Sequence, residues 1–288
     1  MKKKGKNNNM AQEAKPVKIS NRTNVLRDIK NIFKYHELIF SLTKKELKVK
    51  YRGSFLGFFW SLINPILVML VYTFVFSFVM RLGVKDYAVF LISALLSWNF
   101  LANSVNFGAN CIVANSNLVN KIYFPREIIP LSVVFANLFN FLLELAAIMI
   151  VLSFLGYKFY MYLYWLPVLI IIEFLLVSGL TLLVSALNVF FRDLSHLISI
   201  IIMVWFFGTP IIYPLDLVPP KFQTILYFNP MTTITSMYRN IFYHVKYPEG
   251  TVWPSPIIIV SNLAVIILIF FVGYFVFKRL EGKFAEEI

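Results

Sequence analysis

The sequence has little charge, one cysteine and no clustered histidine. Only 14% of its 288 residues are charged, whereas globular proteins average about 25%. Cys111 has no second cysteine to pair with, and the three histidines show no metal-ligand spacing. With 59% hydrophobic residues, this composition excludes a soluble enzyme, a nucleic-acid-binding protein and a secreted disulfide-stabilised protein.

A phosphate-binding loop is also missing from the sequence. Gly-Lys occurs only at 5–6 and 282–283, and neither pair follows the upstream glycine that such a loop requires. The first 52 residues contain no apolar stretch of the signal-peptide type. We therefore expect a chain that hydrolyses no ATP, binds no cofactor or metal of its own and carries no signal peptide.

Long apolar runs dominate the sequence instead. Six of them approach or exceed the roughly 18 residues of a bilayer-spanning helix, although the fifth is short. With a cytoplasmic amino terminus, 21 of the 27 Lys and Arg residues fall on cytoplasmic segments, as the positive-inside rule requires. The sequence thus predicts an all-α integral membrane protein with both termini in the cytoplasm. The expected spans are residues 57–80, 87–107, 128–156, 162–190, 197–213 and 256–277.

The segments that flank the transmembrane domain at 57–277 differ in composition from it. Residues 1–24 are rich in Lys and Asn, which predicts a disordered basic tail. Residues 25–56 include a stretch, 34–52, in which apolar and basic side chains occupy different arcs, so we expect an amphipathic helix at the cytoplasmic interface. A helix docked on the protein's own cytoplasmic face is the alternative. Residues 278–288 are predicted to form a cytoplasmic tail.

Residues 210–256 hold eight of the 13 prolines yet keep apolar stretches such as 222–228. Helices broken by proline at membrane depth are tolerated only where protein packs around them or a wet cavity adjoins them. This pattern favours two half-helices that dip back from the outer face. A compact loop lying flat on that face is the alternative.

Polar side chains recur at helical spacing inside two of the spans. Four amides share one face of the second span and its extension, and such a face is unsuited to lipid. They are Asn99, Asn103, Asn106 and Asn110. Small polar residues share one face of the fourth span, which favours close helix packing over a substrate role. They are Ser178, Thr181, Ser185 and Asn188.

Polar arcs on the first and fifth spans are the best candidates for a transport path. Aromatic rings on these arcs could stack on the amphipathic faces of sugars without gripping one unit tightly. The predicted conduit residues are Ser61, Asn64 and Tyr72 in the first span, and Ser199, Phe206, Thr209 and Tyr213 in the fifth.

Glu144 and Glu173 are the only charged residues near the membrane centre. Helical rise places both about 17 Å below the outer face, which makes them candidate neighbours. A proton relay is one interpretation. We favour a protonated carboxyl in a hydrogen-bonded packing network, because Asn137 and Asn140 share a face with Glu144 and no cation accompanies either residue in the spans.

Several motifs in the chain resemble those of one known family. Residues 52–60 read Arg-Gly-Ser-Phe-Leu-Gly-Phe-Phe-Trp, Pro65 and Val-Tyr-Thr-Phe-Val-Phe (71–76) follow, and 124–131 read Phe-Pro-Arg-Glu-Ile-Ile-Pro-Leu. Further on come Arg192-Asp193, Thr209-Pro210, Tyr213-Pro214, Asn229-Pro230 and Tyr238-Arg239. In this order they resemble the ABC transporter type-2 permeases that export lipid-linked polysaccharides, over roughly residues 30–280. Family members usually read Ser-Pro where this chain has Thr209-Pro210.

The resemblance implies a homodimer in the bacterial inner (cytoplasmic) membrane, paired with two separate ATPase subunits that bind ATP and Mg. The substrate would be O-antigen, capsular polysaccharide or teichoic acid on a polyprenyl-diphosphate carrier. The resemblance also implies an interface helix before the first span and a coupling helix between spans two and three.

Carried onto this sequence, the resemblance assigns two groups of residues, and the charge pattern adds a third. Coupling to the ATPase falls on Asn117, Lys121, Tyr123, Phe124, Pro125, Arg126 and Glu127, for which a basic loop held by anionic headgroups is the alternative. From their positive charge near the inner leaflet, we expect a basic collar that attracts the substrate phosphate, formed by Lys44, Lys45, Lys48, Lys50 and Arg52. The outer gate is formed by half-helices at 215–229 and 230–244, with Pro214, Pro230, Tyr238 and Arg239.

Two functions from other classes remain open. An ion-coupled secondary transporter would use Glu144 and Glu173. A membrane-embedded transferase acting on polyprenyl lipids would need clustered acidic or histidine residues, and Asp193 near His196 is the only such pair.

Overall fold

The structure is a computed structural model in which every regular element of the described residues is helical. It describes residues 34–121, 124–249, 251 and 253–288. The predicted basic tail and the coupling residue Tyr123 lie outside these ranges.

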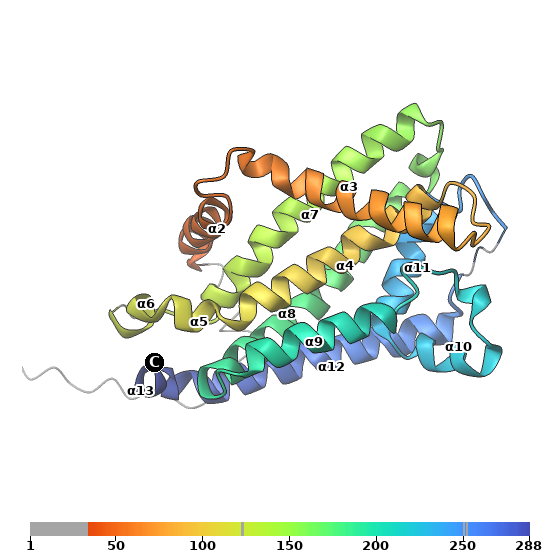
Figure 1. Cartoon of the computed structure of the whole chain (residues 1–288). Coiled ribbons are helices and arrows are strands. Elements are labelled where there is room, and N and C mark those ends of the chain that lie inside the picture. The colour runs from red at the N-terminus through yellow and green to blue at the C-terminus, as the bar shows by residue number, and fades with distance from the viewer. Residues whose placement is uncertain (1–33, 122–123, 250, 252) are drawn as a thin grey trace, which may run out of the picture.

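In the described part of the chain, seven helices of 13 or more residues form the frame together with one amphipathic helix at one end of the molecule (Figure 1). These eight are α2 (His36–Lys50), α3 (Trp60–Thr73), α4 (Tyr87–Ala109), α7 (Ile128–Phe154), α8 (Leu166–Phe190), α9 (Leu194–Phe207), α11 (Pro230–Phe242) and α12 (Pro256–Leu280). Shorter helices connect them: α5 (Cys111–Ala114), α6 (Ser116–Lys121), α10 (Pro220–Tyr227) and α13 (Phe284–Glu287). A π-helical turn, Phe74–Val79, extends α3, and a 3₁₀ turn, Phe159–Trp165, precedes α8.

Five stretches of the described chain are long and apolar enough to cross a bilayer. They are Trp60–Val79, Tyr87–Ala109, Ile128–Phe154, Phe159–Phe190 and Pro256–Glu287. They match five of the six predicted spans. The predicted fifth span, 197–213, corresponds to α9, whose 14 residues rise only about 21 Å against a hydrocarbon core of about 30 Å. The helix ends before Pro210, which has no backbone N–H to continue it, so the sixth crossing stays a prediction.

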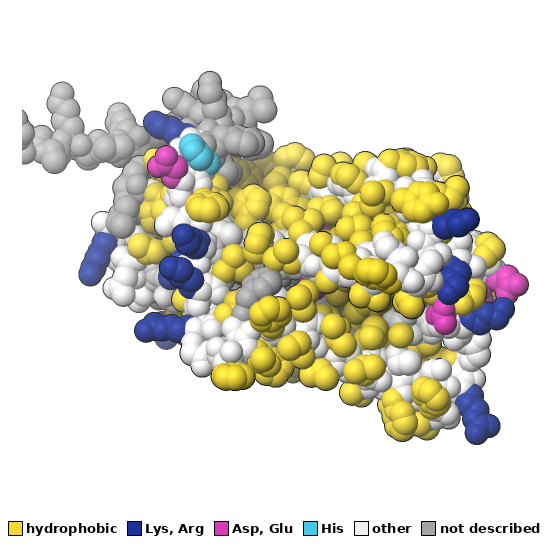
Figure 2. Space-filling model, turned by 90° about the horizontal axis from the view of Figure 1, so that it is seen from above, with side chains coloured by type: hydrophobic (Ala, Val, Ile, Leu, Met, Phe, Trp, Pro, Cys, Tyr) yellow, Lys and Arg dark blue, Asp and Glu magenta, His cyan; other side chains and the backbone are white. Residues whose placement is uncertain are grey.

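Helix α4 forms the centre of the bundle, and α3 lies at its edge. Helices α3, α7, α8, α9 and α11 all pack against α4. Charged side chains gather at the two ends of the molecule, and a wide apolar band separates them (Figure 2). This distribution is typical of a protein whose middle faces lipid.

Helices α8 and α12 cross at two glycines. A Cβ on Gly273 would lie 2.1 Å from the carbonyl oxygen of Gly179, and one on Gly179 would lie 2.6 Å from the Phe270 Cα. Small residues that let two backbones meet are a common means of helix association in membranes.

Helix α2 begins and ends within two residues of the predicted amphipathic stretch. Its apolar arc turns toward the protein: Leu42 is buried in a cluster with Ile128 and Ile129 of α7, and Leu38 and Ile39 pack against the same cluster. The Thr43 hydroxyl also donates to the carbonyl of Ser132 in α7. This arc is therefore docked on the protein itself, as the alternative prediction for this helix expected.

Candidate functional site

A cavity of about 430 Å³ lies between α3, α4 and α7, beside the end of α2. We call it the amide cavity, because five asparagines from its three walls line it together with one carboxylate and one amine. They are Asn64, Asn99, Asn103, Asn137 and Asn140, with Glu144 and Lys50, and the hydroxyl groups of Tyr51, Ser54 and Ser61 add to the polar part of the wall. The apolar part of the cavity wall includes four aromatic side chains, those of Trp60, Phe100, Phe107 and Phe141.

The position of Lys50 is the main feature that the sequence did not reveal. Its ammonium donates a hydrogen bond to Asn137 Oδ1 at 3.3 Å and lies 5.2 Å from the centre of the Phe107 ring. It also interacts electrostatically with Glu144. A cation from α2 thus accompanies a carboxylate that stood alone in the sequence. Lys50 and Asn137 are 87 residues apart, so no local pattern could pair them.

Glu173 has different surroundings from Glu144. It is fully buried in α8 and accepts a hydrogen bond from the Ser97 hydroxyl of α4 at 2.8 Å. The Tyr238 side chain of α11 faces the same carboxyl group. The residues that line the amide cavity include Glu144 but not Glu173. These contacts fit a packing role for Glu173.

The small polar face of α8 is completely buried, with exposed fractions of 0–1% for Ser178, Thr181, Ser185 and Asn188. Asn188 joins three helices: its amide donates to Asn110 at the end of α4, and its oxygen accepts from the Ser195 N–H of α9, each at 3.0 Å. This burial agrees with the predicted packing role of the face.

The predicted conduit residues fall into three places. Ser61 and Asn64 line the amide cavity. Tyr72 of α3 stacks on Phe206 of α9, with ring centres 6.1 Å apart, and Ser199 donates to Asn106 of α4 at 3.0 Å. The first and fifth predicted spans therefore meet at these rings. No single surface of one copy carries all the conduit residues.

Thr209 and Tyr213 belong to a junction at the carboxyl end of α9. Thr209 is buried and accepts a hydrogen bond from the Asn229 amide at 2.9 Å. The Asn229 oxygen in turn accepts from the Trp205 ring nitrogen and from the Met231 N–H that begins α11. Tyr213 donates to the carbonyl of Phe207. Asn229, which the sequence placed only in a family motif, is the centre of this junction.

Four members of the predicted basic collar line an open groove of about 680 Å³ along α2. They are Lys44, Lys45, Lys48 and Arg52, and we call this the basic groove. Lys45 also donates to Asn115 Oδ1 and pairs with Glu46 at 3.6 Å. The fifth member, Lys50, lines the amide cavity instead. Helix α2 thus carries the basic groove and contributes the cation of the amide cavity.

The predicted coupling residues divide into exposed and internal ones. Asn117 and Lys121 are exposed on α6, and Pro125 is half-buried. Phe124 is buried in the cluster that also holds Leu42, and Arg126 donates to the carbonyl of Glu281. Glu127 is buried and pairs with Lys278 of α12 at 2.8 Å. The loop is therefore tied to the end of α12. Among the coupling residues that the structure describes, the exposed ones are Asn117 and Lys121 of α6.

The predicted outer half-helices correspond to α10 and α11, both shorter than expected. Pro230 begins α11, with Asn229 as its N-cap. Tyr238 and Arg239 are buried rather than exposed at a gate. The Arg239 guanidinium donates to the carbonyl of Ile211 at 2.9 Å and lies 3.7 Å from the centre of the Phe90 ring. Pro214 and Arg239 both line a second cavity at this end of the molecule.

Asp86, which no sequence signal singled out, joins three turns at the end of the molecule opposite α2. Its carboxylate accepts hydrogen bonds from Tyr157 at 2.7 Å, Tyr247 at 2.8 Å and Lys246 at 3.2 Å. Hydrogen bonds from the two tyrosines, Tyr157 first, hold the pKa of Asp86 below its ordinary value.

No metal centre accompanies these sites in the part of the chain that the structure describes: groups of three or more His, Cys, Asp or Glu are absent there.

Comparison with known proteins gives a consistent result. The profile of the family described as ABC-2 type transporter matches residues 37–243. The O-antigen export system permease protein RfbA of Myxococcus xanthus is 34% identical over 92% of this chain and 100% of its own length. A protein of the same name from Klebsiella pneumoniae is 35% identical over 87% of this chain and 94% of its own. The polysialic acid transport protein KpsM of Escherichia coli is 20% identical over 69% of this chain and 78% of its own.

Proposed function

Because this chain belongs to the ABC-2 type transporter family, we propose that it is the permease subunit of an ATP-driven exporter of a lipid-linked polysaccharide. It is a multi-pass protein of the bacterial inner membrane. The names of its relatives favour O-antigen, with capsular polysaccharide next, because those relatives are O-antigen and polysialic acid transporters. Teichoic acid is the remaining substrate class and rests on the motif resemblance.

The amide cavity is the observation that carries this proposal. Asparagine amides donate and accept hydrogen bonds equally well, as sugar hydroxyls do, so they can exchange partners along a moving polymer. Aromatic side chains beside them offer faces for sugar rings. Polar walls of this kind are expensive at membrane depth unless they serve a substrate path. The cavity suits a hydroxyl-rich substrate better than an apolar one.

The carrier phosphate has a matching approach along α2. The basic groove attracts anionic headgroups at the membrane surface, and Lys50 places one ammonium inside the amide cavity. We propose that the diphosphate meets the basic groove first and that the glycan behind it enters between α3 and α7.

We propose two separate ATPase subunits and a second copy of this chain as partners. Asn117 and Lys121 on α6 would contact the ATPase, since they are exposed among the coupling residues that the structure describes. Movement of α6 would be transmitted to the membrane-spanning helices by the Glu127–Lys278 pair, which joins this loop to α12. The conduit would then form where the α3 and α9 faces of two copies meet, because one copy does not assemble the path alone.

Deletion of the chain in its own bacterium tests the proposal. We expect surface glycan to disappear while the lipid-linked polymer accumulates on the cytoplasmic side, and a plasmid copy to restore export. Gel analysis of surface and intracellular glycan measures both. Normal surface glycan in the deletion strain would contradict the proposed function.

An ion-coupled transporter is the second candidate, and the placement of Lys50 near Glu144 is the observation that favours it. Glu144→Gln keeps the hydrogen-bonding capacity of the wall and removes the titratable group. The exporter predicts near-normal glycan export in this variant, because ATP supplies the driving force. Loss of export with normal protein abundance would favour ion coupling. Glu286→Gln, the same change at an exposed position of α13, controls for expression.

A further inference from the structure

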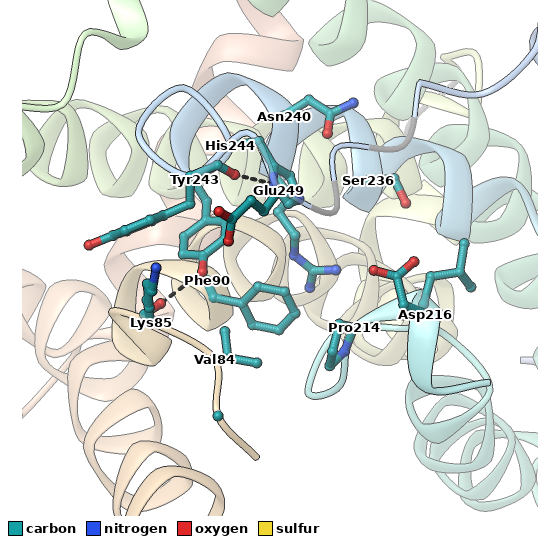
Figure 3. A pocket seen from close by; sticks show the side chains of 14 residues that line it. Val84, Lys85, Phe90, Pro214, Asp216, Ser236, Asn240, Tyr243, His244 and Glu249 are labelled. Carbon is teal, nitrogen blue, oxygen red and sulfur yellow. Dashed lines mark hydrogen bonds between the residues drawn. The ribbon is translucent and has the colours of Figure 1, made fainter. Parts of the chain in front are cut away.

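A second cavity, of about 290 Å³, lies at the end of the molecule opposite α2 and α6. We call it the outer pocket. Its walls come from the turn before α4, the segment that follows Thr209-Pro210, and α11 with the turn after it. Figure 3 shows the side chains of these segments converging on one space. The proposed transport path uses none of these side chains except the gate residues Pro214 and Arg239.

Arg239 provides a fixed donor at the wall of the outer pocket. It is only 4% exposed, and one of its terminal nitrogens is held by the Ile211 carbonyl while the plane lies over Phe90. Its Nε is buried and has no hydrogen-bond partner among the described residues. A buried donor left without a partner costs free energy. A bound ligand with an acceptor oxygen would remove that cost.

Two carboxylates provide acceptors for the same ligand. Asp216 and Glu249 lie on opposite sides of the pocket in Figure 3. Both are exposed, and neither forms a salt bridge with a described residue. Each carboxylate oxygen can therefore accept hydrogen bonds from a visiting hydroxyl group.

The charges of the outer pocket favour a neutral ligand. The two positive charges of Lys85 and Arg239 balance the two negative charges of Asp216 and Glu249. Burial lowers the pKa of His244, which disfavours a further positive charge there. Because these charges cancel, a phosphate or a carboxylate ligand would gain no net attraction from them, and a neutral ligand loses nothing by comparison. A neutral molecule rich in hydroxyl groups meets donors, acceptors and the aromatic wall of Tyr243 and Tyr247.

We propose that the outer pocket binds one neutral sugar residue of the glycan as it leaves the membrane. The volume suits one ring or a short part of a chain, near the small end of ligand pockets. Sugar bound here would hold the exported end outside and oppose backward movement. This inference rests on the proposed function and adds a product-side binding site to it.

The test uses the permease with its ATPase in lipid nanodiscs. The probe is the bacterium's own surface glycan, released by mild acid and fractionated to chains of two to six sugars. We expect saturable binding by saturation-transfer NMR. The double variant Asp216→Asn, Glu249→Gln should bind about tenfold more weakly, because hydrogen bonds to charged groups are lost. Lys221→Gln, an exposed change on α10 outside the pocket, should bind as the parent protein does.

Three results would overturn the inference: no saturable binding, equal binding by the double variant, or displacement of the fragments by millimolar inorganic phosphate, which would indicate an anion site. The variants are at exposed positions, and an unchanged melting temperature confirms folding. A failure of the proposed function gives a different experimental result from a failure of the outer pocket. Surface glycan that persists in the deletion strain overturns the exporter, whereas lost export together with absent fragment binding overturns the outer pocket alone.

Discussion

Glycine is required at two positions where α8 crosses α12. Any side chain at Gly179 or Gly273 must displace backbone atoms of the facing helix, because the nearest contacts would be 2.6 and 2.1 Å. Overpacking of this kind costs about 1–3 kcal/mol, and more where backbone has to move. We expect Gly179→Ala and Gly273→Ala each to lower the melting temperature of the purified protein by several degrees. Gly282→Ala is the control, since nothing lies within 4 Å of its added methyl group. Equal effects at all three glycines would show that the crossing is not tight.

Asp86 gives the outer turns a dependence on pH. Its folded-state pKa lies below the ordinary value of 3.8, so its stabilisation is complete above about pH 4 and is lost as the pH falls through the folded pKa. At pH 6 the substitution Asp86→Asn should lower the free energy of unfolding by about 1 kcal/mol. This is near the low end for charged hydrogen bonds, because the side chain is 43% exposed. Thermal melts from pH 6 to pH 3 should show this difference shrinking below pH 4. A difference that stays constant over that range would exclude the carboxylate as its source.

At the scale of single residues, the sequence identified side-chain types better than their partners. Helical spacing placed Asn99 and Asn103 on one face of the helix, and both line the amide cavity. It could not show that Lys50 joins them, because that contact depends on how α2 docks on α7. The same limit hid Asp86, whose three donors come from distant turns.

Asn229 determines how the outer helices join α9. Its side chain accepts from Trp205 and Met231 and donates to Thr209. Asn229→Ala removes all of these bonds and should lower stability by about 2–4 kcal/mol, with export reduced because α10 and α11 separate from α9. Asn229→Asp keeps the accepted hydrogen bonds and loses only the donated ones. Its stability and its export should therefore lie between those of the parent protein and those of Asn229→Ala. Melting temperature and surface glycan measure the effects, and two equally mild variants would contradict the role of this junction.

At the scale of elements, apolar runs predicted the helix bounds well where the helix ends at the same point as the apolar run. The spans at 87–107 and 128–156 differ from α4 and α7 by two residues at most. The helix predicted at 197–213 extends past the end of α9 at Phe207. The apolar run continues through Gly208 and Pro210, but the helix does not. The sequence could not show whether the apolar arc of α2 faces lipid or the protein, because both environments favour the same amphipathic pattern.

At the scale of the whole molecule, one copy presents parts of a path rather than a complete one. The amide cavity borders α3, the stacked Tyr72–Phe206 pair joins α3 to α9, and the outer pocket lies beyond α11. Composition predicted the membrane class, and motifs predicted the family. Neither could place the two cavities at opposite ends of the bundle, because each is built from segments far apart in the chain.

The central claim is that this chain moves a glycan with energy from a separate ATPase. The most direct test is affinity purification of the tagged permease from its native membranes in mild detergent, with quantitative mass spectrometry of the complex. The account predicts a nucleotide-binding ATPase subunit at close to one copy per permease, with binding weakened by Lys121→Glu on α6. A folded permease that reproducibly purifies without any ATPase would contradict the account.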